Sequence, residues 1–260
     1  MAGIGFEIRK ILEKDTFLSV LQAYGFAGLI SSGPWVLSIL AVMVIGVISL
    51  GLVVPSAAIV QFLVSVTYLM ASSLTLTGVL QLLFTRFVAD RLYEQKQSII
   101  LPNIIGALLV VSVSATIIAV PILSLFTGQS TLYVLLMHAN FLVLCNLWIV
   151  LIFLSSMKAY TQILLLFSVG YTIAVIGALS LAGFGLEGLL GGVLLGHGFL
   201  LFSFLFLIVR EYPGDQLVAF DFLKGGRFLS AWHLPGSSSM PACGLTSSSS
   251  GFTRIPHRRS

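Results

Sequence analysis

The sequence predicts an all-α, polytopic membrane protein: a bundle of six transmembrane helices. Of its 260 residues, 58% are hydrophobic and only 8% are charged, against roughly 25% charged in an ordinary soluble domain. Residues 16–85 contain no Asp, Glu, Lys or Arg, and about 20 apolar residues suffice to cross the hydrocarbon core. Because these stretches lack a period of two, we expect helices and not barrel strands. The composition excludes a soluble globular domain and a disordered chain.

Six spans follow from the charge-free stretches. We expect them at residues 33–54, 60–84, 100–122, 132–154, 160–182 and 188–209. Residues with turn chemistry separate three pairs of spans, at 54–56, 127–130 and 182–185. The expected domain organisation is therefore an N-terminal segment 1–16, a transmembrane lobe 17–210 and a tail 211–260.

The charge-free stretch before the second span is too long for one straight crossing. Residues 16–54 would form a helix of about 58 Å at 1.5 Å per residue, whereas the hydrocarbon core is about 30 Å thick. We place a break at Ser31-Ser32-Gly33-Pro34, because proline removes a helical hydrogen bond and clashes with the preceding turn. Residues 17–32 then form a half-helix that lines a cavity or lies at the membrane interface.

The N-terminal segment 1–16 has the pattern of an amphipathic helix. One face would carry Ile4, Ile8, Ile11 and Leu12, with Glu and Lys residues elsewhere. It predicts a helix at the membrane interface, in contact with lipid; the alternative is a plain cytoplasmic cap.

Lys and Arg residues predict the orientation. They occur in the N-terminal segment, after the second span, after the fourth span and after the sixth span, whereas the three intervening loops have none. By the positive-inside rule these segments are cytoplasmic, and so are both termini. The basic residues form no stripe on one face, so nucleic acid is not an expected partner.

Arg86, Asp90 and Arg91 are candidate pathway residues at the cytoplasmic end of the second span. Arg86 and Asp90 are one helical turn apart and could pair; the alternative to a vestibule rim is a solvated helix end. His138 and His197 lie inside spans, where each could carry a proton or could simply hydrogen-bond a neighbouring helix. Other polar residues in the spans are predicted to join helices: Gln61, Ser72, Ser73, Thr75, Gln81, Asn140 and Asn146.

Gly188, Gly192 and Gly196 recur every four residues and share one helix face, which predicts close helix packing. No catalytic motif, carboxylate pair or metal-ligand spacing occurs, so we expect no enzyme activity, no cofactor and no metal. Cys145 and Cys243 lie in regions that should not meet.

Four stretches resemble one family. They are residues 2–10, residues 25–35 (GFAGLISSGPW), residues 84–94 (FTRFVADRLYE) and residues 204–214 (FLFLIVREYPG). Together they resemble the N-terminal half of the PelG family, inner-membrane transporters of bacterial Pel exopolysaccharide systems. The resemblance implies one lobe of a two-lobe, alternating-access flippase that moves a partly deacetylated amino-sugar polymer. It also implies a glycosyltransferase, a cyclic-di-GMP receptor and a further membrane subunit as partners, and points to the Gly33-Pro34 break and to residues 86–91.

The composition changes from about Gly225, where a run rich in Ser, Pro and His begins. We expect the resemblance to end near Lys224 and the rest to be disordered, as a flexible cytoplasmic tail or as the product of truncation or a frameshift.

Two function classes remain in competition. The first is an export lobe with a polar cavity between the first, second and fourth spans. The second is a non-transporting membrane scaffold of a polysaccharide synthase complex. A multidrug exporter is less favoured, because it would want carboxylates inside the membrane and none is present there.

Overall fold

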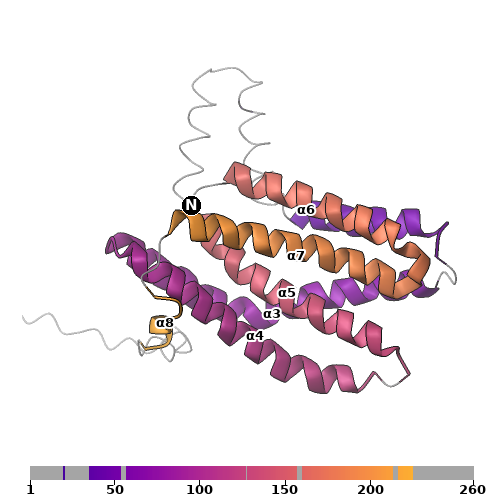
Figure 1. Ribbon diagram of the computed structural model, residues 1–260, viewed down its shortest axis with the longest axis horizontal. Helices are drawn as coiled ribbons and strands as arrows, with labels where there is room; N and C mark the ends of the chain where they lie inside the picture. The colour runs from indigo at the N-terminus through magenta and orange to yellow at the C-terminus, as the bar shows by residue number, and fades with distance from the viewer. Residues whose placement is uncertain are drawn as a thin grey trace, which may run out of the picture. The chain divides into compact units, whose positions relative to one another are not determined.

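The computed structural model describes residues 20, 35–53, 57–126, 128–156, 160–212 and 216–224, all within the unit Met1–Lys224. All regular structure in these residues is helical (Figure 1). The elements are a helix at Trp35–Ser49, α3 (Ala57–Tyr93), η1 (Gln97–Ile99), α4 (Ile100–Ser124), α5 (Thr131–Ser156), α6 (Tyr160–Ser180), η2 (Ala182–Phe184), α7 (Gly185–Glu211) and α8 (Asp221–Lys224). Five of the described helices are long and apolar enough to cross a membrane, and Trp35–Ser49 is a shorter apolar helix. The predicted all-α membrane bundle is confirmed.

The second span differs most from its predicted bounds of 60–84. Helix α3 has 37 residues and continues to Tyr93, so it carries Arg86, Asp90 and Arg91 on helical backbone. At 1.5 Å per residue it is about 55 Å long, well beyond the roughly 30 Å hydrocarbon core. Conversely, the first helix ends at Ser49 and not at residue 54. The segment 1–16, the break Ser31–Pro34 and the tail from Gly225 lie outside the described residues.

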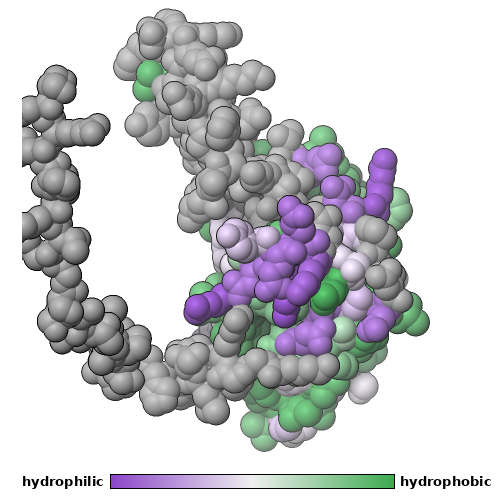
Figure 2. All heavy atoms as spheres, turned by 90° about the vertical axis from the view of Figure 1, so that its left-hand side faces the viewer, coloured by the Kyte–Doolittle hydropathy of each residue, from purple (hydrophilic) through white to green (hydrophobic). Residues whose placement is uncertain are grey.

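The two ends of the bundle differ in charge. Ser65 on α3 contacts Tyr133 on α5, and Ser73 contacts Trp148, so α3 and α5 run in the same direction. The residues we call the charged end lie where α3 and α7 finish: Arg86, Asp90, Arg91, Glu94, Lys96, Arg210 and Glu211. Figure 2 views the molecule from this side, where hydrophilic residues gather. The opposite end carries Glu187, whose carboxylate accepts a hydrogen bond of 2.6 Å from Ser130.

Large apolar side chains fill the interior. Helices α5 and α7 pack together, α6 lies on α7, and α3 and α4 lie on α5. Four phenylalanines are fully buried: Phe62, Phe84, Phe153 and Phe204. Among the described residues, no Asp, Glu, Lys or Arg is buried. The core of the described helices is therefore mainly apolar and holds no charged side chain.

The glycine face of α7 brings two helix backbones together, as predicted. A Cβ added at Gly192 would overlap the backbone of Ala178 on α6, and one added at Gly196 would lie 2.7 Å from the Gly170 carbonyl oxygen. A Cβ at Gly188 would overlap the Leu181 carbonyl. Close backbone approach supplies the van der Waals contact that holds helices together in lipid.

Several predicted polar contacts between helices form. Asn140 Nδ2 donates to the Leu190 carbonyl on α7 at 3.3 Å, and Asn146 Nδ2 donates to Ser112 Oγ on α4 at 2.9 Å. Trp148 Nε1 donates to Ser73 Oγ at 3.0 Å, and the Trp148 ring stacks on Trp35 at 4.8 Å. These contacts tie α5 to each of its neighbours.

Three residues of that predicted set bond within α3 instead. Ser72 and Thr75 donate to the carbonyls of Tyr68 and Ala71, and Gln81 Nε2 donates to Thr77 Oγ1. In a helix the carbonyl one turn earlier is the nearest acceptor, so a hydroxyl that faces away from the bundle bonds there.

Asn103 on α4 binds the segment after α7 through hydrogen bonds, which we call the Asn103 clasp. The fully buried side-chain amide of Asn103 accepts a hydrogen bond from the Asp221 backbone N–H at 2.7 Å and donates one to Asp221 Oδ2 at 3.2 Å. The Ala219 N–H donates to the Pro102 carbonyl at 3.0 Å, and Gly106 leaves room for the Ala219 backbone. The Phe222 ring meets Phe84 edge-on at 5.7 Å. Residues 219–222 thus dock on α3 and α4.

Substitution of Gly192 by Ala should destabilise the bundle by about 1–3 kcal/mol, because the new methyl group overlaps the α6 backbone. Thermal unfolding in detergent measures this. The control is Gly198→Ala on the same helix, where an added Cβ meets nothing within 4 Å. It should be neutral or stabilising, since alanine is the better helix former. Equal unfolding temperatures for the two variants would contradict the close packing.

The Asn103 clasp is testable by hydrogen exchange of residues 217–224. Asn103→Asp places a carboxylate against that of Asp221, so amide protection of Asp221 and Phe222 should fall. Adding Asp221→Asn restores a donor and acceptor pair and should restore protection. Unchanged protection in the single variant, or no recovery in the double variant, would show that the clasp does not hold this segment.

Candidate functional site

The exposed face of α3 carries polar side chains that form no hydrogen bond to another helix in the described part of the chain. Four of them point outward over three helical turns: Thr67, Tyr68, Ser72 and Thr75. Their spacing of one, four and three residues puts them on one side of the helix. The exposed positions of α4 and α7 differ, because they are large and apolar, as at Leu109, Val113, Phe202 and Phe206.

The hydroxyl groups on this face do not join helices. Thr67 Oγ1 donates to the Leu63 carbonyl at 2.7 Å, Ser72 Oγ to the Tyr68 carbonyl at 2.6 Å, and Thr75 Oγ1 to the Ala71 carbonyl at 2.8 Å. Each oxygen therefore keeps its acceptor capacity for a group outside the bundle. Tyr68 is 70% exposed, and no partner for its hydroxyl is found in the described part of the chain.

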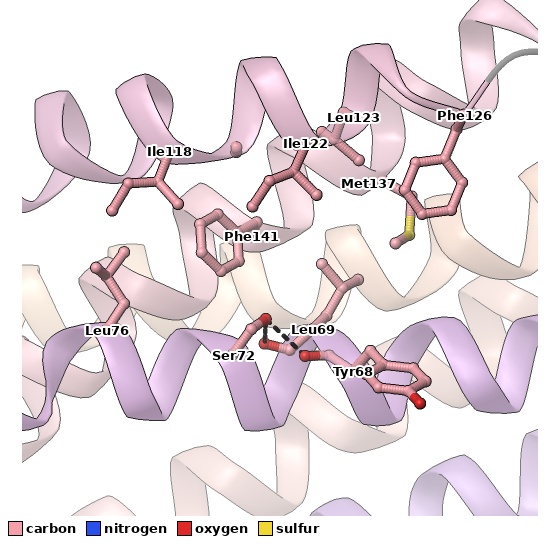
Figure 3. Close-up of a pocket in the computed structure, with 11 residues that line it drawn as sticks. Tyr68, Leu69, Ser72, Leu76, Ile118, Ile122, Leu123, Phe126, Met137 and Phe141 are labelled. Atoms are coloured by element: carbon pink, nitrogen blue, oxygen red, sulfur yellow. Dashed lines mark hydrogen bonds between the residues drawn. The ribbon is translucent and has the colours of Figure 1, made fainter.

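Two grooves flank this face. One lies between α3 and α4 over α5, with a volume of about 390 Å³; Leu69 and Leu76 face Ile118, Ile122 and Phe141 across it (Figure 3). The other lies between the Trp35–Ser49 helix and α3, with a volume of about 670 Å³. Both are lined mainly by apolar side chains. The polar cavity predicted between the first, second and fourth spans stays a prediction, since residues 21–34 before the first described helix lie outside the described part of the chain.

The predicted residues Arg86, Asp90 and Arg91 lie on the last turns of α3. Among the described residues, the ion pairs here join Glu94 to Arg91 at 2.6 Å and to Lys96 at 3.2 Å, and the expected pair of Arg86 with Asp90 is not one of them. Hydrogen bonds from Lys96 and Arg91 lower the pKa of Glu94. The Arg91 guanidinium also lies 5.1 Å from the centre of the Phe87 ring. Arg86 is exposed.

The two intramembrane histidines are not brought to these residues. His138 lies near the start of α5, towards the end opposite Arg86, and its Nδ1 has no hydrogen-bond partner among the described residues. His197 is fully buried in α7 and meets the Tyr171 ring edge-on at 5.7 Å. The Val193 carbonyl is near the His197 ring, but neither ring nitrogen makes a well-formed hydrogen bond.

In the part of the chain that the structure describes, no three His, Cys, Asp or Glu side chains come close enough to hold a metal ion. Neither of the two described grooves is lined by an acid and base pair. The described part of α3 offers an outward face of hydroxyl groups and one aromatic ring.

Thr67, Tyr68 and Asn103 were not singled out from the sequence. A usable signal was present for the first two: within a charge-free span, hydroxyl residues repeat at helical spacing at positions 67, 68, 72 and 75. No comparable signal marks Asn103, whose partner is 118 residues away.

A comparison with protein families matches residues 1–237 to PelG, described as an exopolysaccharide exporter (EPS-E). The match covers most of the chain and extends past Lys224, where we expected the resemblance to end. Comparisons with curated proteins and with solved structures give no match. The match agrees with a bundle of apolar helices that has charge only at its ends, and the chain belongs to the PelG family of exopolysaccharide exporters.

Proposed function

We propose that this chain is one bundle of an alternating-access transporter that carries a Pel-type exopolysaccharide across the bacterial inner membrane. The observation that supports it is that the core of the described helices is mainly apolar and holds no charged side chain. A hydrated polymer would lose its hydrogen bonds to water in such a core, so the proposal does not route it through the interior of this bundle. The pathway would then lie along an outer face of this bundle, opposite a second bundle. The second bundle would be another lobe or another copy.

The proposed orientation places the charged end in the cytoplasm. The basic residues that the positive-inside rule assigns to the cytoplasm, Arg86, Arg91, Lys96 and Arg210, gather at this end. Both termini would be cytoplasmic. There the bundle could receive a polymer from a glycosyltransferase and contact a cyclic-di-GMP receptor and a further membrane subunit. The proposed activity is transport, with no bond made or broken by this chain.

The same mainly apolar, uncharged core is also compatible with the scaffold hypothesis. A bundle without an internal passage could hold the partner subunits together and leave transport to another protein. The two hypotheses differ in whether this chain must change conformation for polymer to leave the cell.

Complementation separates them. In bacteria that lack their own exporter of this family but retain the remaining subunits, the chain should restore secreted polymer. Cross-linking that joins the α3 face to a second bundle should stop secretion, because alternating access needs relative movement. Co-purification of partner subunits without secretion would contradict transport by this chain and favour the scaffold. A chain that restores secretion and still does so when cross-linked would contradict alternating access.

A further inference from the structure

We propose that the outward face of α3 is the saccharide-contacting surface of this bundle, with Thr67, Tyr68, Ser72 and Thr75 as the residues that meet the polymer. The proposal rests on the proposed function, because it names where on this bundle the exported polymer would run.

The first step is a contrast between surfaces. Between the ends of α4 and α7, their large exposed side chains are aliphatic or phenylalanine. Helix α6 exposes hydroxyl groups, among them those of Ser168 and Thr172, and each of these two donates to a carbonyl of its own helix, so exposed hydroxyls alone do not mark a polar partner. The face of α3 differs from α6 because it adds a phenol, that of Tyr68, to three aliphatic hydroxyls within three turns.

The second step concerns Tyr68. Its phenol is a hydrogen-bond donor that ordinarily finds a partner when it leaves water. Its side chain is 70% exposed, and its hydroxyl has no partner in the described residues. An unpaired donor facing hydrocarbon costs free energy, whereas one facing a hydrated polymer does not.

The third step is the chemistry of the occupant. A sugar ring presents hydroxyl groups at its edge and C–H groups on its faces. The hydroxyl groups of Thr67, Ser72 and Thr75 donate hydrogen bonds to backbone carbonyls of α3, and their oxygens can still accept hydrogen bonds from sugar hydroxyls. The Tyr68 ring offers a flat apolar surface to the C–H groups. The face carries no charge, so it suits the sugar backbone of a polymer and not an ion.

The fourth step concerns length. Polar residues occur along α3 from Gln61, which bonds Gln129 at one end of the bundle, to the exposed Arg86 at the charged end. Exposed aliphatic side chains also lie between them, at Val64, Val79 and Leu82. At 1.5 Å per residue the distance from Gln61 to Arg86 is about 37 Å, longer than the roughly 30 Å hydrocarbon core. The proposed contact surface is the polar stretch from Thr67 to Thr75, and α3 itself is long enough to run beside a polymer across the membrane.

The test removes the hydroxyls and keeps the shape. The triple variant Thr67→Val, Ser72→Ala, Thr75→Val is compared with the double variant Ser168→Ala, Thr172→Val on α6. The α6 hydroxyls are also exposed and also donate to carbonyls of their own helix, so they form a matched control. Because none of these groups joins helices, both variants should keep the wild-type unfolding temperature and membrane abundance. Secreted polymer should fall about tenfold for the α3 variant and stay unchanged for the α6 variant.

A second pair of variants places a large side chain on each face. Ser72→Trp should block secretion, because the indole would occupy the proposed contact surface, and Ser168→Trp on α6 should not. Wild-type secretion by both α3 variants at equal abundance would overturn the proposal, and so would an equal loss on α3 and α6. The wild-type chain controls for the proposed function. If it secretes no polymer in the complemented strain, transport by this chain fails; if it does and the α3 variants match it, only the assignment of the surface fails.

Discussion

The structure depends on one constraint, which is that the hydrocarbon core supplies no hydrogen-bond partners. Every backbone group must then be satisfied inside its own helix, and a polar side chain within the core costs free energy unless it finds a protein partner. Asn140, Asn146 and Trp148 do so across helix interfaces, and all three lie on α5. Charged residues meet the same constraint by lying beyond the core, at the two ends of the bundle.

Close packing completes the core and determines where transport can occur. The glycine face of α7 lets α6 approach until the backbones touch, and phenylalanine side chains fill the space around α5. Such packing fills the interior of the described helices mainly with apolar side chains. The proposed pathway therefore lies on an outer face, and α3 exposes a phenol together with hydroxyl groups, whereas the large exposed side chains between the ends of α4 and α7 are aliphatic or phenylalanine. The Asn103 clasp adds a fixed contact at the charged end, where residues 219–222 rejoin the bundle.

The fold was largely predictable, because lack of charge marks each span directly. The ends of the helices were less predictable than their number and type. Absence of charge shows where a helix can cross the membrane, but it does not show where the helix stops. Helix α3 continues for nine residues past its predicted end at position 84, into a segment that carries charged residues. Glu94 forms ion pairs with both Arg91 and Lys96. Helical spacing alone did not indicate that Arg91 would pair with Glu94. The predicted polar cavity between the first, second and fourth spans stays a prediction, since residues 21–34 lie outside the described part of the chain. The contact of Asn103 with Asp221 is set by tertiary folding, which no local pattern encodes.

In the proposed arrangement, α3 borders a hydrated pathway and α4 borders lipid. The direct measurement is cysteine accessibility in cells, with Cys145 and Cys243 replaced and single cysteines placed at Thr67, Ser72 and Thr75. Their reaction with a water-soluble thiol reagent is compared with that of cysteines at Leu109 and Val113 on α4, which are also exposed on the bundle. We expect the α3 positions to react and the α4 positions not to react. Equal protection of both sets would show that α3 faces lipid and would contradict the proposed pathway along α3.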